Sequence, residues 1–280
     1  MLKEHDEVQQ TGTRLERIHR PSYNDFYQNY FKKSRPVIIT GVADQWDALS
    51  KWTIEYLRSS SEDQNMEVVA SKGQSTIGNQ EKGWKTHRKL DMGFKEFLTR
   101  IENKDDSNRY FYLQYQSFDK FPHLRQDFTP PTEYIRNSNI NTRIWIGSGQ
   151  NITPLHHDTQ SNLLTQITGR KKFTLFSPSE SQSLYPFPFN SPNRTLSPVN
   201  LHEPDLQKYP RFKNAHPIEG ILEPGEMIFQ PAFWWHQVET LSTEMTISIT
   251  FMWPSPLHSY FSYLGIRNLA SRVLQGTNAD

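Results

Sequence analysis

The first third of the chain alternates between apolar segments of extended and of helical character. Residues 35–42 (RPVIITGV) form a short apolar run that ends near a glycine, a pattern typical of a buried strand. In residues 50–60 (SKWTIEYLRSS), Ser50 precedes apolar residues at helical spacing, which predicts a helix capped by that serine. Residues 66–70 (MEVVA) predict another strand, and residues 94–103 (FKEFLTRIEN) predict a second amphipathic helix.

From residue 110 onward the pattern changes to short runs of β-branched and aromatic residues. Gly, Pro, Asn and Ser separate runs such as TRIWIGSG, KKFTLF and MTISITFMW, as in a sandwich or barrel of short strands. A Pro-rich insert at residues 185–212 interrupts them, and we expect a surface loop there with one helical turn near residues 204–207. Residues 257–274 predict a final amphipathic helix, through which a homodimer could form.

These patterns predict one mainly β domain over residues 1–280, with a core at about 110–253 and helices at both ends. Residues 1–20 are polar, and we expect them to be flexible. The net charge of +1 argues against a protein that coats nucleic acid. With no cysteine, a metal would need nitrogen and oxygen ligands. No segment resembles a signal peptide or a membrane span, so we expect a soluble cytoplasmic protein.

The stretch TPLHHD at residues 153–158 is the first candidate for chemistry. Alone, an HxD triplet can equally be a polar turn after Pro154. In an extended segment, residues i and i+2 point to the same face, so His156 and Asp158 can share one ion while His157 faces away. His236, in the aromatic stretch PAFWWHQVETL, can supply a third ligand or be an ordinary core histidine. Two histidines and one carboxylate form the facial triad of non-haem Fe(II) oxygenases.

The segment GRKKFTLF places Lys171 and Lys172 at the start of a strand after Gly169. Adjacent strand residues face opposite sides, so at most one of the two lysines can point inward. An inward lysine is costly unless it meets an anion, whereas two solvated lysines after a turn are common. The sequence therefore leaves both interpretations open for Lys171 and predicts that the other lysine faces solvent.

Five separated motifs in this order resemble the JmjC/cupin-like 2-oxoglutarate oxygenases. They are TPLHHDTQSNLLTQITGRKKFTLFSP, LYPFP, NLHEPDLQKYPRF, EPGEMIFQPAFWWHQVETL and ISITFMW. The subgroup that they most resemble contains the asparaginyl hydroxylase acting on hypoxia-inducible factor. The resemblance implies a double-stranded β-helix (jelly roll) that binds Fe(II), 2-oxoglutarate as cosubstrate, and dioxygen.

The resemblance also implies a role for single residues. Iron would bind to His156, Asp158 and His236, and the distal carboxylate of 2-oxoglutarate to Lys171, Thr153 and Tyr112, with Asn162 lining the same pocket. Gln114 and Arg194 match or lie near positions that contact a peptide substrate in the subgroup. Thr250 departs from the pattern, because the asparaginyl hydroxylase has an asparagine in its last core strand. This departure puts the inner wall and the substrate identity in doubt.

The expected function is therefore hydroxylation of a protein or peptide side chain of the Asn, Asp or His type. The same chemistry on a small molecule or a tRNA nucleoside is the first alternative, and lysine demethylation is the second. A cupin that only binds a ligand, without catalysis, is a different class of function. The local basic segments GRKK and RFK fit a nucleic-acid substrate, but the balanced charge does not favour it.

Overall fold

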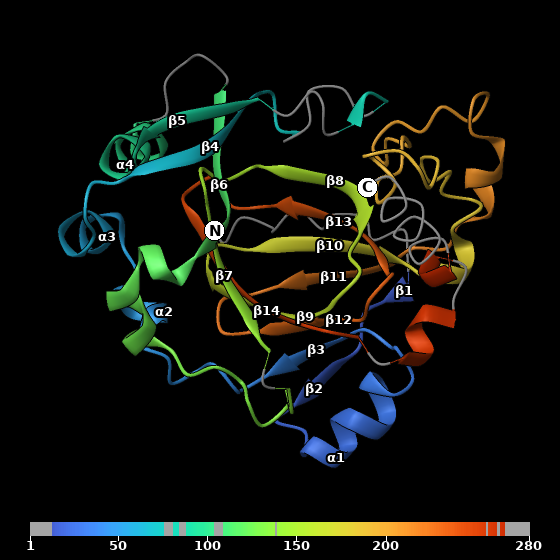
Figure 1. Ribbon diagram of the computed structural model, residues 1–280, viewed down its shortest axis with the longest axis horizontal. Helices are drawn as coiled ribbons and strands as arrows, with labels where there is room; N and C mark the ends of the chain where they lie inside the picture. Colours follow the sequence, from blue (N-terminus) through green and yellow to red (C-terminus); the bar gives the residue numbers. More distant parts are fainter. Residues whose placement is uncertain are drawn as a thin grey trace, which may run out of the picture.

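Two facing β-sheets build the molecule, as the computed structural model shows in Figure 1. The structure describes residues 13–75, 81–83, 88–103, 109–137, 139–255, 257–261 and 264–266. Eight strands form the double-stranded β-helix: β7 (Asn141–Gly147), β8 (Ile152–His157), β9 (Ser161–Thr168), β10 (Lys171–Phe176), β11 (Ile218–Leu222), β12 (Met227–Gln230), β13 (Trp235–Thr240) and β14 (Thr246–Trp253). Of these, β7, β9, β12 and β14 belong to one sheet and β8, β10, β11 and β13 to the other. The predicted jelly roll is confirmed.

Strands from the first part of the chain extend both sheets. The larger sheet has the order β2-β3-β12-β9-β14-β7-β6-β4-β5, and the smaller has the order β1-β11-β10-β13-β8. The added strands are β1 (Thr13–Arg14), β2 (Arg17–His19), β3 (Val37–Thr40), β4 (Asn65–Lys72), β5 (Lys89–Gly93) and β6 (Arg109–Ser117). The expected flexibility is therefore wrong for residues 13–19, because the sheet edges pair with their backbone. Residues 1–12 lie outside the described residues.

The main hydrophobic core lies between the larger sheet and the helices of the N-terminal half. On β14, Ile247, Ile249 and Phe251 are buried in this core, whereas Thr250 and Met252 line a cavity on the other side of the sheet. The helical segments are α1 (Tyr23–Phe26), η1 (Tyr27–Phe31), α2 (Ala48–Lys51), α3 (Ile54–Ser60), α4 (Phe94–Glu102), η3 (Phe118–Lys120), η4 (Pro122–Asp127), η5 (Pro178–Glu180), η6 (Pro210–Asn214) and η7 (Leu257–Phe261). The helix predicted at 94–103 is confirmed as α4.

The single helix predicted at residues 50–60 is wrong. The chain forms α2 and α3 with a break at Trp52, and Thr53 caps α3 by accepting a hydrogen bond from the Tyr56 backbone N–H. The break follows from tertiary contacts, because the Trp52 indole N–H and the Tyr56 hydroxyl both donate to the carboxylate of Asp127, at 2.9 and 2.8 Å. That carboxylate is buried, so it stabilises the positions of both rings.

The Pro-rich insert is more than the surface loop that the sequence predicts. Its residues Leu196, Ser197 and Val199 are fully buried. The backbone N–H of Ser197 donates to Leu155 O, and that of His157 donates to Thr195 O, so the insert covers the free edge of β8. The helical turn expected near residues 204–207 is present: residues 206–208 form a turn in which the Tyr209 backbone N–H donates to Asp205 O at 2.8 Å. A 3-10 helix, η6, follows with Pro210 at its first position.

The predicted C-terminal helix at 257–274 lies mostly outside the described residues. Within them, η7 is a 3-10 helix and residues 264–266 are α-helical. A homodimer through this segment stays a prediction. Among the described residues, no helix has both the length and the apolar character needed to cross a bilayer.

Candidate metal centre

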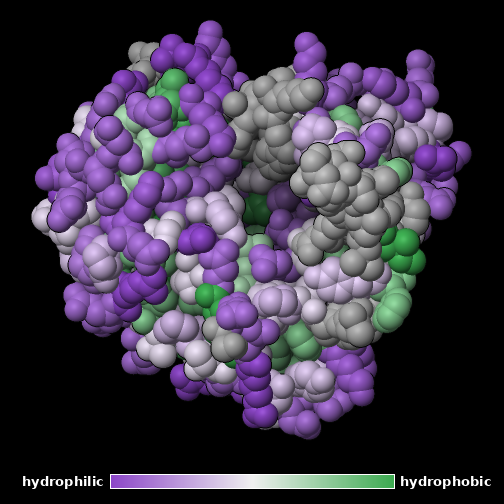
Figure 2. All heavy atoms as spheres, in the orientation of Figure 1, coloured by the Kyte–Doolittle hydropathy of each residue, from purple (hydrophilic) through white to green (hydrophobic). Residues whose placement is uncertain are grey.

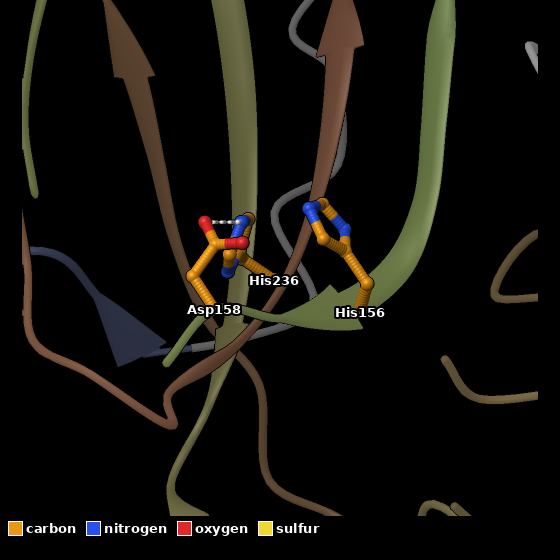
Figure 3. A group of neighbouring side chains, drawn as sticks. All are labelled: His156, Asp158 and His236. Atoms are coloured by element: carbon orange, nitrogen blue, oxygen red, sulfur yellow. Dashed lines mark ion pairs between the residues drawn. The ribbon is translucent and has the colours of Figure 1, made fainter. Parts of the chain in front are cut away.

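The two sheet registers bring His156, Asp158 and His236 together. His156 on β8 is the direct cross-strand partner of His236 on β13, and Asp158 follows β8 at its end. One ligand atom from each residue lies within 4.8 Å of the others. Figure 3 shows the three side chains pointing toward one another. Within the described part of the chain, this is the one group of three or more such side chains that could hold a metal ion.

His157 points away from this group, as strand alternation predicts. Its ring packs against the Trp235 indole at 4.7 Å between centroids, in an edge-on arrangement. Burial lowers the pKa of His157 to about 3, so the ring is neutral at physiological pH. His157 is thus a core residue beside the metal ligands, and the choice between the two neighbouring histidines follows from the extended backbone.

Backbone carbonyls fix the orientation of both ligand imidazoles. Nδ1 of His156 lies 2.8 Å from Pro154 O, and Nδ1 of His236 lies 3.0 Å from Trp234 O. Because a carbonyl oxygen can only accept, each Nδ1 donates to it, and Nε2 is the ring nitrogen directed toward the group. Metal-bound histidines commonly have this second hydrogen bond. His156 on β8 and His236 on β13 therefore share one arrangement, in which Nδ1 contacts the backbone carbonyl oxygen two residues upstream.

Electrostatics in the group also fit a cation. Burial, together with the neighbouring His156, lowers the pKa of His236 to about 4, so its ring is neutral at pH 7. The contact of 3.7 Å between His236 Nε2 and Asp158 Oδ2, dashed in Figure 3, is then not an ion pair. The Nε2 lone pair of His236 and a carboxylate oxygen of Asp158 instead point toward the same position. Two imidazole nitrogens and one carboxylate match the donor set of non-haem Fe(II).

The three residues lie in the wall of a cavity inside the jelly roll. Its volume of about 100 Å³ is several times the roughly 10–15 Å³ that one water molecule requires. Figure 2 shows that this face of the molecule is hollowed near its middle. The cavity is lined by Tyr112, Tyr115, Trp145, Thr153, His156, Asp158, Asn162, Leu164, Lys171, Gln230, His236, Val238, Thr250 and Met252.

Lys171 lines the same cavity and is 2% exposed. Its ammonium donates to Ser248 Oγ at 2.7 Å and to the Tyr112 hydroxyl at 3.2 Å, and the Ser248 hydroxyl donates onward to Gln166 at 2.8 Å. Among the residues that the structure describes, no carboxylate pairs with it. Burial accordingly lowers the pKa of Lys171 to about 7. A buried ammonium with only hydroxyl partners is a site for an anion.

Lys172 does not face solvent as the sequence predicts. Its side chain is mostly buried on the opposite face of β10, and its ammonium pairs with Glu219 Oε1 at 2.8 Å. Thr174 donates to the same carboxylate oxygen at 3.2 Å. Strand alternation correctly separates the two lysines, but on the second face the Glu219 carboxylate of the neighbouring strand β11 pairs with Lys172.

The other predicted site residues divide into two groups. Thr153 and Asn162 line the cavity, as the resemblance implies, and so does Thr250, which accepts a hydrogen bond from the Trp145 indole at 3.1 Å. Gln114 on β6 and Arg194 in the insert are not among the lining residues. Arg194 lies two positions before Leu196, which forms an isolated β-bridge with His156.

Sequence reasoning missed several residues of the cavity. Ser248 binds Lys171, and Tyr115, Trp145 and Gln230 line the wall. Ser248 belongs to a strand of clear alternation, but only its hydrogen bond with the cavity-lining Lys171 shows that its hydroxyl-bearing face points inward. The left-handed backbone of Tyr115, with φ of 54°, lies at a bulge between β6 and β7, which no local pattern indicates.

Comparison with known proteins gives one family. The model of the cupin-like domain matches residues 23–259. Lysine-specific demethylase 8 of Xenopus tropicalis is 31% identical over 251 residues, covering 88% of this chain and 54% of that protein. JmjC domain-containing protein D of Dictyostelium discoideum is 32% identical over 256 residues, covering 83% and 55%. The tRNA wybutosine-synthesizing protein 5 of Homo sapiens is 28% identical over 256 residues, covering 85% and 76%.

The chain spans little more than half the length of the first two relatives. None of the three is the asparaginyl hydroxylase whose subgroup the motifs suggested, so that finer expectation is not supported. Two of the five motifs behind it contain the three candidate metal ligands and Lys171, which do not specify a substrate. The family match over most of the chain agrees with the jelly roll and its His–Asp–His group, and the chain belongs to the cupin-like JmjC family.

Proposed function

We propose that this protein is an oxygenase that uses Fe(II), 2-oxoglutarate and dioxygen to oxidise a C–H bond of a bound substrate. One observation carries the proposal: Lys171, a buried ammonium with no carboxylate partner among the described residues, shares a cavity with His156, Asp158 and His236. A lysine that needs an anion, placed in one cavity with a facial metal triad, fits a chelating dicarboxylate.

The residues at the lysine end of the cavity would hold the distal carboxylate. Lys171 supplies charge, and the Tyr112 and Thr153 hydroxyls line the same space. Burial raises the pKa of Tyr112, so its phenol stays protonated and can donate. Ser248, bound to Gln166, positions the ammonium through its hydroxyl oxygen. The 2-oxo acid end would then point toward the metal ligands.

Bound iron would couple oxidation of the 2-oxo acid to that of the substrate, so that 2-oxoglutarate, O₂ and R–H yield succinate, CO₂ and R–OH. The chain itself supplies two oriented imidazoles and a carboxylate in the wall of one pocket, together with the buried Lys171. This chemistry needs no general base.

The substrate is the part of the proposal on which sequence and comparisons differ. Peptide hydroxylation rested on Gln114, which does not line the cavity, and on the resemblance to the asparaginyl hydroxylase subgroup, which the comparisons do not support. The names of the relatives point instead to lysine side chains and to tRNA. These two alternatives, demethylation of lysine and oxidation of a tRNA nucleoside, therefore take precedence over the asparaginyl-type reaction.

Anaerobic addition of Fe(II) and 2-oxoglutarate should give a visible charge-transfer band, and oxygen should then produce succinate. The band reports bidentate binding of the 2-oxo acid to iron beside Lys171, so it tests the site without a known substrate. Glutarate, which lacks the keto group, is the matched control and should give no band. Protein that binds iron but shows neither band nor succinate would be a non-catalytic cupin, and the oxygenase proposal would fall.

Affinity for 2-oxoglutarate should fall as pH rises above 7. With a pKa of about 7 before binding, the Lys171 ammonium is half protonated at pH 7 and about one-tenth protonated at pH 8. Anion binding favours the protonated form, so affinity is full below this pKa and decreases about fivefold from pH 7 to 8. Titration at saturating metal between pH 6.5 and about 8.5 measures the effect. Lys171→Arg should flatten it, and an unchanged slope would contradict the role of this lysine.

A further inference from the structure

Two buried amides in the cavity wall have one unsatisfied atom each. Asn162 on β9 and Gln230 on β12 are cross-strand partners, both 4% exposed, and the Asn162 amide donates to Gln230 Oε1 at 3.0 Å. Asn162 Oδ1 and Gln230 Nε2 have no hydrogen-bond partner within the described part of the chain. Buried amide atoms are rarely left unpaired, so the pair points to a ligand group.

The pair offers the same chemistry in either orientation of its amides. If both side chains are rotated by half a turn, Gln230 donates to Asn162, and one acceptor and one donor again stay free. A carboxylate, which only accepts, can satisfy the donor and not the acceptor. The complementary ligand therefore carries an N–H donor beside an acceptor, as the edge of a nucleobase or a carboxamide does.

The opening of the cavity favours a planar ring. Tyr115, 41% exposed, and Trp145 both line the cavity, and their rings meet edge to face at 5.8 Å between centroids and 69° between planes, so a flat ligand can stack on one of them. Rings in this position stack with flat ligands. The guanidinium of Arg143 lies 5.1 Å from the centre of the Tyr115 ring and forms no ion pair among the described residues. A carboxamide side chain would use the amide pair but neither the rings nor this cation.

The charge of the cavity disfavours a cationic substrate. Asp158 is its one acidic lining residue in the described part, and it belongs to the metal group. Lys171 lines the same cavity, and Arg143 lies at the Tyr115 side. A methylated lysine would bring a further positive charge without a carboxylate to meet it. A neutral base attached to a phosphodiester meets no such penalty.

We propose that the cavity accepts an unpaired nucleobase of RNA, stacked on the exposed ring of Tyr115 and read at its edge by Asn162 and Gln230. The assignment rests on the proposed function, because it names the substrate class of the same site. Arg143 is then placed to contact the adjoining phosphate. The experiment below measures binding without turnover, so it separates this assignment from the oxygenase activity.

The test titrates RNA hexamers into protein loaded anaerobically with Fe(II) and 2-oxoglutarate, read by fluorescence anisotropy. The probes are oligo-U, oligo-A and oligo-C, an abasic hexamer of equal charge, and an asparagine-containing peptide. At least one base-bearing hexamer should bind about tenfold or more tightly than the abasic one. Equal binding of both would reduce the interaction to phosphate contacts and overturn the proposal, as would binding of the peptide alone.

Two variants locate the contact. Gln230→Leu should reduce base-dependent affinity about tenfold, because it removes the donor and leaves the volume similar. Tyr115→Asn, at an exposed position whose left-handed backbone suits asparagine, should reduce it by a similar factor without a folding defect. Phe189→Ala, a comparably exposed aromatic outside the cavity lining, is the matched control and should change nothing.

The outcomes separate the two proposals. If the charge-transfer band forms but no hexamer binds better than its abasic counterpart, the nucleobase assignment is overturned and the oxygenase proposal stands. If base-dependent binding occurs but survives both Gln230→Leu and Tyr115→Asn, the amide pair is merely structural, for example bridged by water, and the assignment falls as well.

Discussion

Asp158→Ala is expected to remove iron binding and all succinate production while leaving the fold intact. Asp158 provides the one carboxylate of the group, and its side chain is 39% exposed, so no packed core depends on it. Loss of a residue that only hydrogen-bonds to a metal ligand already costs about 10–100-fold in metal affinity, and loss of a direct ligand should exceed that. Isothermal titration with Fe(II) under nitrogen measures the affinity, and thermal unfolding of the metal-free protein checks the fold.

His157→Phe is the matched control for this substitution. The neighbouring ring faces away from the cluster and packs edge-on against Trp235, so phenylalanine can occupy its place. Metal affinity and turnover should stay within about threefold of the wild type, well short of the loss expected for a ligand. If His157→Phe lost iron and Asp158→Ala kept it, the extended geometry of β8 would have been assigned to the wrong residues.

Lys171→Met should abolish 2-oxoglutarate binding and at the same time stabilise the protein without ligands. The folded-state pKa of about 7 lies below the ordinary value for lysine of about 10.4, so the native fold opposes the charge at neutral pH. Removing the charge should raise the free energy of unfolding by about 2 kcal/mol at pH 7. Because this cost decreases as pH rises through the interval between the two pKa values, the gain should vanish toward pH 10.

Calorimetry with and without 2-oxoglutarate, at saturating Zn(II), separates the two effects. The wild type should gain stability from the ligand by mass action, whereas Lys171→Met should not. Lys172→Met is the matched control with the opposite sign. It should keep 2-oxoglutarate binding but lose roughly 3 kcal/mol, because the buried Glu219 carboxylate would lose its cation. A stable Lys172→Met with lost ligand binding would reverse the assignment of the two lysines.

Local periodicity predicted those features that depend on one strand or one helix. The alternation of side chains along an extended chain separated His156 and Asp158 from His157, and Lys171 from Lys172. The helical spacing in residues 94–103 predicted α4, whose apolar face is buried in the main core. These predictions held because the backbone geometry of a strand or helix sets the spacing at which side chains share a face.

Periodicity does not tell which face of a strand packs in the core and which face points into the cavity. On β14, the apolar face packs against the helices, and the face with Ser248 and Thr250 looks into the jelly roll. The face of this sheet that points into the jelly roll is thus its more polar face, because it lines the cavity. For the same reason the sequence could place neither Ser248 beside the lysine nor Gln230 beside Asn162.

The sequence by itself determined a domain of short strands and an HxD spacing that puts His156 and Asp158 on the same side, and its family resemblance implied the jelly roll and His236 as a third ligand. Only the tertiary structure shows that His236 lies beside the other two, since the pairing of β13 with β8 closes a gap of about eighty residues. The tertiary structure also decided that the Pro-rich insert covers the edge of β8, and that the Asn162 and Gln230 amides of the cavity each keep one unsatisfied atom among the described residues. Such features depend on contacts between distant segments, whose partners no local pattern of residues specifies.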